Sequence, residues 1–219
     1  MYMIASSSVG VSVATAGIGV AHRRFLDGPG GWLLAWVVVD AFASVASTVG
    51  AIQYQNAQYV VQAWYPISAA LALCLVASAM ATEAGRRPLF MLAGVVALTI
   101  VGLTLAVEEP GSFAKVTGVI HGMTLLLVGS ALVLYRTRKS RGDMFGDQLF
   151  IIGAAFILVG APSPLLAIGV RFTGPDQREL HSLMFALKNL LGALSYLLMI
   201  VAFHMAEQRD RQRIARPSP

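Results

Sequence analysis

Apolar residues fall into seven stretches of about 20 residues each, separated by short polar breaks. The stretches cover residues 3–21, 31–53, 59–81, 88–107, 113–135, 149–172 and 181–205. A helix needs about 20 apolar residues to cross the hydrocarbon core of a bilayer. The pattern predicts an all-α integral membrane protein, a seven-transmembrane-helix bundle over residues 1–206 with a short basic tail at 207–219.

Composition leads to the same class. The chain is 57% hydrophobic and only 12% charged, with a mean hydropathy of +0.70, which excludes an ordinary soluble domain and a disordered chain. Its single cysteine, Cys74, excludes an intramolecular disulfide and a cysteine metal cluster. The net charge of +5 does not indicate nucleic-acid binding, because the basic residues are spread over short breaks without aromatic residues between them.

The basic residues predict how the bundle is oriented. Twelve of them lie in alternate breaks and in the tail, whereas the opposite breaks hold only Lys115, Arg171 and Arg178. The twelve are Arg23, Arg24, Arg86, Arg87, Arg136, Arg138, Lys139, Arg141, Arg209, Arg211, Arg213 and Arg216. The positive-inside rule then places the amino terminus outside and the carboxyl terminus in the cytoplasm, for a multi-pass protein of the plasma membrane.

Prolines mark two of the stretches. Pro66 lies inside the third stretch, where it removes a backbone donor and favours a kink. Ala161-Pro162-Ser163-Pro164 lies near the middle of the sixth stretch and predicts an interrupted helix. Interrupted helices at membrane depth occur where protein or a wet cavity satisfies the freed backbone groups.

Three ionisable residues lie deep inside apolar stretches: Asp40, His121 and Lys188. Such residues are costly in a membrane and indicate a functional site. Counting helical rise, Asp40 and Lys188 differ in height by about 6 Å within a core of about 30 Å, which a lysine side chain can bridge. We therefore expect an Asp40–Lys188 pair with His121 beside it, and with neutral polar groups from Gln62, Tyr65, Asn189 and Ser195 around it.

Two interpretations of this cluster remain open. The first is a binding site for a small or lipid-soluble ligand, or for a proton, in a sensor or carrier. A sensor of this kind would pass its signal to a protein partner. The second is that Asp40 and Lys188 neutralise each other and lock two helices together, with no ligand.

Three further alternatives involve particular chemistry. Lys188 in the last helix, with Gly192 four residues later, resembles the lysine arrangement of retinal proteins. This resemblance implies a retinal bound through Lys188, although the third helix has Gln62 where a carboxylate would be expected.

The layout also resembles small seven-helix terpene cyclases. That resemblance implies an enzyme that uses Asp40 as an acid on an isoprenoid or lipid substrate, and Ser140-Arg141-Gly142 matches their basic turn, whereas no second acid occurs around Ala193 and Ser195. Haem binding through His121 would need a second histidine on another helix.

Motifs of other chemistry are absent. The sequence contains no Gly-rich phosphate loop after a strand, no His-Glu-x-x-His zinc motif and no Gly-x-Ser-x-Gly elbow. The sequence patterns therefore predict neither a metal site nor a hydrolytic triad.

Overall fold

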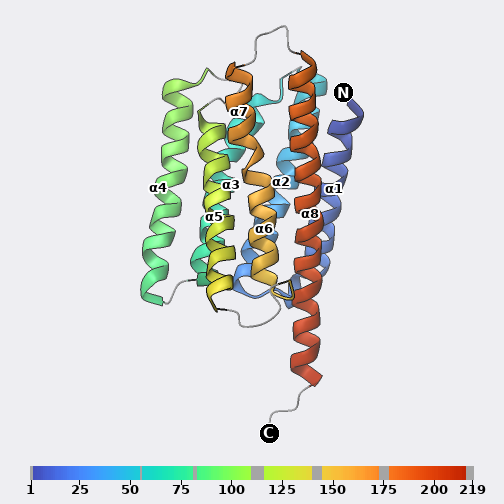
Figure 1. Cartoon of the computed structure of the whole chain (residues 1–219), viewed down its shortest axis with the longest axis vertical. Helices are drawn as coiled ribbons and strands as arrows, with labels where there is room; N and C mark the ends of the chain where they lie inside the picture. The colour runs from blue at the N-terminus through green and yellow to red at the C-terminus, as the bar shows by residue number, and fades with distance from the viewer. Residues whose placement is uncertain are drawn as a thin grey trace.

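The protein is an up-and-down bundle of helices (Figure 1). The computed structural model describes residues 2–54, 56–80, 83–109, 116–139, 145–172 and 178–215, and these contain no strand. The helices are α1 (Tyr2–Ala21), the short 3-10 helix η1 (Arg23–Phe25), α2 (Gly28–Gln53), α3 (Gln58–Met80), α4 (Glu83–Val107), α5 (Thr117–Lys139), α6 (Gln148–Gly160), α7 (Pro162–Phe172) and α8 (Arg178–Ala215).

Each predicted stretch overlaps one or two helices in the part of the chain that the structure describes. Six spans in the described residues are long and apolar enough to cross a membrane, as in a multi-pass membrane protein, and α1 adds a shorter apolar helix over Val9–Ala21. The break predicted by the two prolines is confirmed, because α6 ends at Gly160 and α7 begins at Pro162. Helix α3 is continuous through Pro66, so the proline that was expected to kink this helix does not end it. The last helix extends to Ala215, so the described part of the predicted tail is helical.

The core lies between α2, α3, α5, α6 and α8. Trp36 of α2 is at its centre, with its ring edge-on to Phe156 of α6 at 5.2 Å and tilted against Trp64 of α3 at 5.9 Å between centroids. Met199 and Phe203 of α8 are fully buried against the same cluster. This packing brings the inner faces of the five helices together, and with them the polar residues of those faces.

Helix α4 lies at the edge of the bundle, where it packs mainly on α3 (Figure 1). Its outward side chains are large, apolar and exposed: Phe90, Met91, Leu92, Val95, Leu98, Val101 and Leu105. Such a surface would be unfavourable in water and is suited to lipid.

Two acidic residues fix the ends of helices. Glu108 accepts hydrogen bonds from the backbone N–H groups of Val116 and Thr117 at 2.8 and 2.9 Å and from the Thr117 hydroxyl at 2.6 Å, so it caps the start of α5. Asp147 caps α6 through the N–H groups of Leu149 and Phe150. The same carboxylate forms an ion pair with Arg136 of α5, which ties the ends of α5 and α6 together.

Candidate functional site

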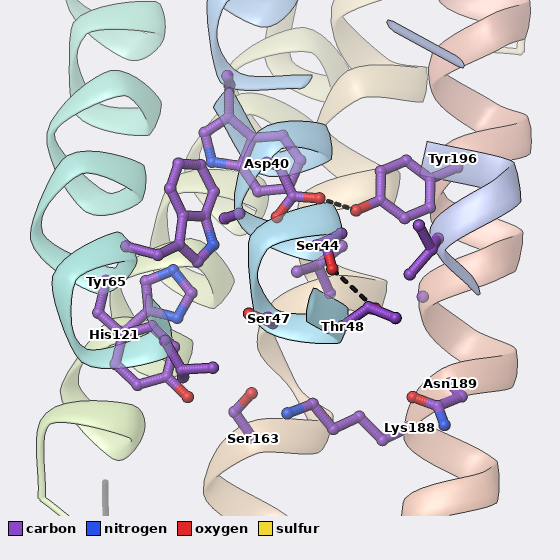
Figure 2. A pocket seen from close by; sticks show the side chains of 17 residues that line it. Asp40, Ser44, Ser47, Thr48, Tyr65, His121, Ser163, Lys188, Asn189 and Tyr196 are labelled. Carbon is purple, nitrogen blue, oxygen red and sulfur yellow. Dashed lines mark hydrogen bonds between the residues drawn. The ribbon is translucent and has the colours of Figure 1, made fainter. Parts of the chain in front are cut away.

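A cavity of about 350 Å³ opens among the inner faces of α2, α3, α5, α7 and α8 (Figure 2). Polar side chains from all five helices line it. They are Asp40, Ser44, Ser47 and Thr48 of α2, Tyr65 of α3, His121 of α5, Ser163 of α7, and Lys188, Asn189 and Tyr196 of α8. Trp36 and Trp64 add aromatic walls. The volume lies at the lower end of the range for small-molecule sites.

Helix packing brings α5 and α7 together at the cavity wall. A Cβ atom added to Gly122 of α5 would lie 2.7 Å from the Cβ atom of Ser163 and 2.8 Å from Cδ of Pro164. Only glycine permits this approach without a shift of α7. The contact places His121, the residue before Gly122, beside the first turn of α7, where the helix is interrupted. The interruption thus forms part of the cavity wall.

Asp40 occupies one end of the cavity, where its carboxylate accepts a hydrogen bond from the hydroxyl of Tyr196. The indole of Trp64 lies next to the same carboxylate, and Trp36 precedes Asp40 by one helical turn. Asp40 is half-buried and therefore remains accessible from the cavity. This end combines a carboxylate with aromatic rings, a combination that suits a cation or a hydrogen-bond donor.

Lys188 lies at a different level of the cavity. Figure 2 shows its side chain extending from α8 toward Ser163, away from Asp40. The predicted direct Asp40–Lys188 ion pair is wrong for this structure, because the described residues form no such pair within 4.0 Å. Tyr196 is instead the partner of Asp40, and the ammonium of Lys188 has no hydrogen bond or ion pair with a described residue. The two charges interact only across the cavity.

His121 is held by a buried chain of hydrogen bonds. Trp36 donates its indole N–H to Ser68 Oγ at 2.8 Å, and Ser68 Oγ lies 2.8 Å from Nε2 of His121. Tryptophan can only donate, so Ser68 Oγ accepts from Trp36 and then either donates its own proton to Nε2 or accepts a second proton from it, according to the imidazole tautomer. Nδ1 is buried without a partner, and the ring, which is 5% exposed, stacks on Tyr65 with 4.5 Å between centroids. A buried ring nitrogen without a partner at a cavity wall is a rare feature that needs an explanation.

Five of the predicted site residues share this cavity: Asp40, Tyr65, His121, Lys188 and Asn189. Two do not. Gln62 donates to the backbone oxygen of Glu109 at 3.3 Å and lines a separate groove between α3 and α4. Ser195 is fully buried and donates to the carbonyl of Gly192 at 2.6 Å, within its own helix. Their side chains are therefore directed away from the cavity.

The structure adds residues that the sequence analysis did not select. Trp36 and Tyr196 were missed although simple helical spacing relates them to predicted residues: Trp36 is four residues before Asp40, and Tyr196 is eight residues after Lys188. Ser68 was missed because a single serine in an apolar helix carries no signal of its own. Ser163 was predicted only as part of the helix interruption.

The geometry of the cavity bears on the three alternative chemistries, which are haem binding, retinal binding and terpene cyclisation. No second histidine lines the cavity among the described side chains, so His121 has no partner for axial haem ligation there. Lys188 does face the cavity, as a covalently bound aldehyde would need, whereas Asp40 is not adjacent to it. The Ser140-Arg141-Gly142 turn lies outside the described residues.

Comparison with protein-family models, with curated proteins and with solved structures gives no match for this chain. The two charged groups of the cavity face one space from two levels, and neutral donors and acceptors lie between them (Figure 2). Such a site can bind the two ends of one small molecule.

Proposed function

We propose that this chain crosses the plasma membrane seven times, with its carboxyl terminus in the cytoplasm, and binds a small ligand in the cavity. The observation that carries the proposal is Lys188, whose ammonium faces the cavity without a hydrogen-bond or ion-pair partner among the described residues. An unpaired ammonium in a membrane-embedded site is costly. An acidic or strongly accepting group of a ligand supplies the missing partner.

The two ends of the cavity define the chemistry of the ligand. At the Lys188 end, Asn189 and Ser163 provide further groups that can hold an acidic or carbonyl oxygen. At the Asp40 end, Trp36 and the carboxylate suit a cationic, hydrogen-bond-donating or apolar part. The ligand is therefore a small amphipathic or zwitterionic molecule.

Sensing is the favoured role. Carriers built from repeats usually contain discontinuous helices in both halves. In the part of the chain that the structure describes, the interruption between α6 and α7 is the one clear discontinuity. A ligand that contacts α7 and α8 together can shift these helices relative to each other, and we expect a protein partner to read that shift at the end of the bundle that carries the basic residues.

A membrane-embedded enzyme is the second candidate, and the aromatic surroundings of Asp40 favour it. A carboxylic acid can donate a proton to an isoprenoid double bond, and aromatic faces stabilise the cation that develops. Trp36 and Trp64 lie where such a cation would form. This candidate requires Asp40 but gives Lys188 no direct task.

The experiment is native mass spectrometry with an absorption spectrum of the purified full-length protein. We expect a small molecule that copurifies with the wild type and is lost from Lys188→Met. Thr99→Val, in which an outward threonine of α4 is replaced, serves as the control and should retain the molecule. A molecule retained by Lys188→Met but lost, or converted differently, in Asp40→Asn supports the enzyme instead. A wild type that binds nothing from lipid or cell extract contradicts both candidates.

A further inference from the structure

A second cluster of polar side chains joins α1 to α8, away from the cavity. His22 follows α1, and His204 and Glu207 are one turn apart on α8. Nε2 of His22 lies 3.1 Å from Oε2 of Glu207, and Nδ1 of His204 lies 3.9 Å from the same oxygen. The imidazole rings of His22 and His204 meet edge to face, with centroids 4.7 Å apart. One potential ligand atom from each of the three residues lies within 4.8 Å of the other two.

These distances suit a tetrahedral metal site. With metal–nitrogen and metal–oxygen bonds of about 2.0–2.2 Å, tetrahedral ligand atoms lie about 3.2–3.6 Å apart. The distances of 3.1 and 3.9 Å from Glu207 lie on either side of that range. The three ligand atoms lie within 4.8 Å of one another, a wider limit than that range, so exposed His204 has to rotate to complete the geometry.

His22 is already oriented as a metal ligand. Its Nδ1 lies 2.8 Å from the carbonyl oxygen of Ile18, which requires a proton on Nδ1. That bond fixes the ring and directs Nε2 toward Glu207. Metal-binding histidines commonly donate their other ring N–H to a backbone carbonyl in this way. Without a metal, Nε2 can contact the carboxylate favourably only if the imidazole carries a second proton.

The packing of α1 on α8 holds the cluster in place. A Cβ atom added to Gly19 would lie 2.8 Å from Leu34 Cδ1 and 2.8 Å from Cε2 of fully buried Phe203. Gly19 is one turn before His22, and Phe203 directly precedes His204. Arg211 forms an ion pair with Oε1 of Glu207 at 2.7 Å, which leaves Oε2 for the histidines.

We propose that His22, His204 and Glu207 bind a divalent first-row transition metal ion, with zinc as the best match. Two imidazoles and one carboxylate suit zinc, copper, nickel or cobalt, whereas magnesium and calcium prefer oxygen ligands alone. Three protein ligands leave one position of a tetrahedral ion for water. The ion links α1 to α8 at the end of the bundle where α8 continues beyond the other helices (Figure 1). This site is independent of the function proposed for the cavity.

The test is a cobalt titration of the full-length protein after treatment with a chelator. We expect one Co²⁺ per chain, with the visible absorption of a tetrahedral site, and displacement by Zn²⁺. His22→Gln, His204→Gln and Glu207→Gln should each weaken binding by about 10-fold or more, by comparison with the losses seen for outer-shell changes. Arg211→Gln is the matched control, because it removes a neighbour of Glu207 but no ligand, and its affinity should change far less.

Two results would overturn the proposal. If the wild type binds no Co²⁺ at millimolar concentration, the cluster is an imidazolium–carboxylate ion pair only. If all variants bind Co²⁺ equally, the metal lies elsewhere. Should a variant not fold, X-ray absorption of the zinc-loaded wild type decides the matter: scattering from two imidazoles supports the site, and an oxygen-only shell refutes it.

Discussion

Gly129 of α5 and Gly153 of α6 face each other where the backbones of the two helices approach closely. A Cβ atom on Gly129 would lie 2.5 Å from the carbonyl oxygen of Gly153, and a Cβ atom on Gly153 would lie 2.8 Å from the carbonyl oxygen of Gly129. Seven residues away on each helix, Gly122 and Gly160 repeat the contact. Small residues permit such an approach between membrane helices. The pairing fixes α5, and with it His121, against the interrupted helix.

Gly129→Ala should therefore destabilise the protein. The added methyl group meets backbone atoms that cannot move independently, and overpacking of this kind typically costs about 1–3 kcal/mol. The measurement is thermal unfolding in detergent. Gly102→Ala on α4 is the control, since a Cβ atom there meets nothing within 4 Å and alanine favours helix. Equal melting temperatures for the two variants would contradict the described packing of α5 on α6.

Tyr196→Phe should destabilise the protein through Asp40. The substitution keeps the ring but removes the hydroxyl that donates to the Asp40 carboxylate, and hydrogen bonds to charged groups contribute about 1.5–3 kcal/mol. Asp40→Asn should cost less, because the amide oxygen still accepts that bond. Tyr135→Phe is the control, as this hydroxyl contacts Lys139 at an exposed position. If Tyr196→Phe and Tyr135→Phe melt at the same temperature, Tyr196 is not the partner that stabilises Asp40.

The helices could be predicted from the sequence because membrane thickness alone sets their length. Proline likewise predicted the interruption between α6 and α7, since it lacks the backbone donor that a continuous helix needs. The ionisable residues deep inside apolar stretches, Asp40, His121 and Lys188, do face one cavity. Each of these features is determined within one helix, so it can be predicted from one sequence without knowing how the helices pack.

Contacts between helices were not predictable in the same way. The rotation of each helix decides which polar residue meets which, and depth alone paired Asp40 with Lys188 when Tyr196 is its partner. Ser195 illustrates a second difficulty. The hydroxyl of a serine in a membrane helix can donate to a backbone carbonyl of the same helix, as Ser195 does to Gly192. A polar residue in an apolar stretch therefore does not by itself indicate a site.

Reporter fusions test the proposed topology. A reporter after residue 215 should be active only in the cytoplasm, because the basic breaks are expected to remain inside. Fusions at Asp27 and at Glu109 should report opposite sides, since three expected spans separate them. Each fusion truncates the chain, so the control is a reporter inserted at the same point within the full-length chain. Activity of the Asp27 and Glu109 fusions on the same side would contradict seven crossings, and an extracellular carboxyl terminus would reverse the orientation.

Lys188→Met separates a binding site from a structural ion pair. Asp40 keeps its hydrogen bond to Tyr196 when Lys188 is removed, so the variant should melt no lower than the wild type, and the loss of an unpaired ammonium should raise stability. A direct buried pair would instead lose about 3–5 kcal/mol when one partner is removed. In a double-mutant cycle with Asp40→Asn, the coupling should stay well below that of a direct pair, because the two charges interact only across the cavity. Ligand binding should fall in the same variant that gains stability, because the ammonium is the group that holds the ligand. A destabilised Lys188→Met that still binds would argue for the structural pair and against the site.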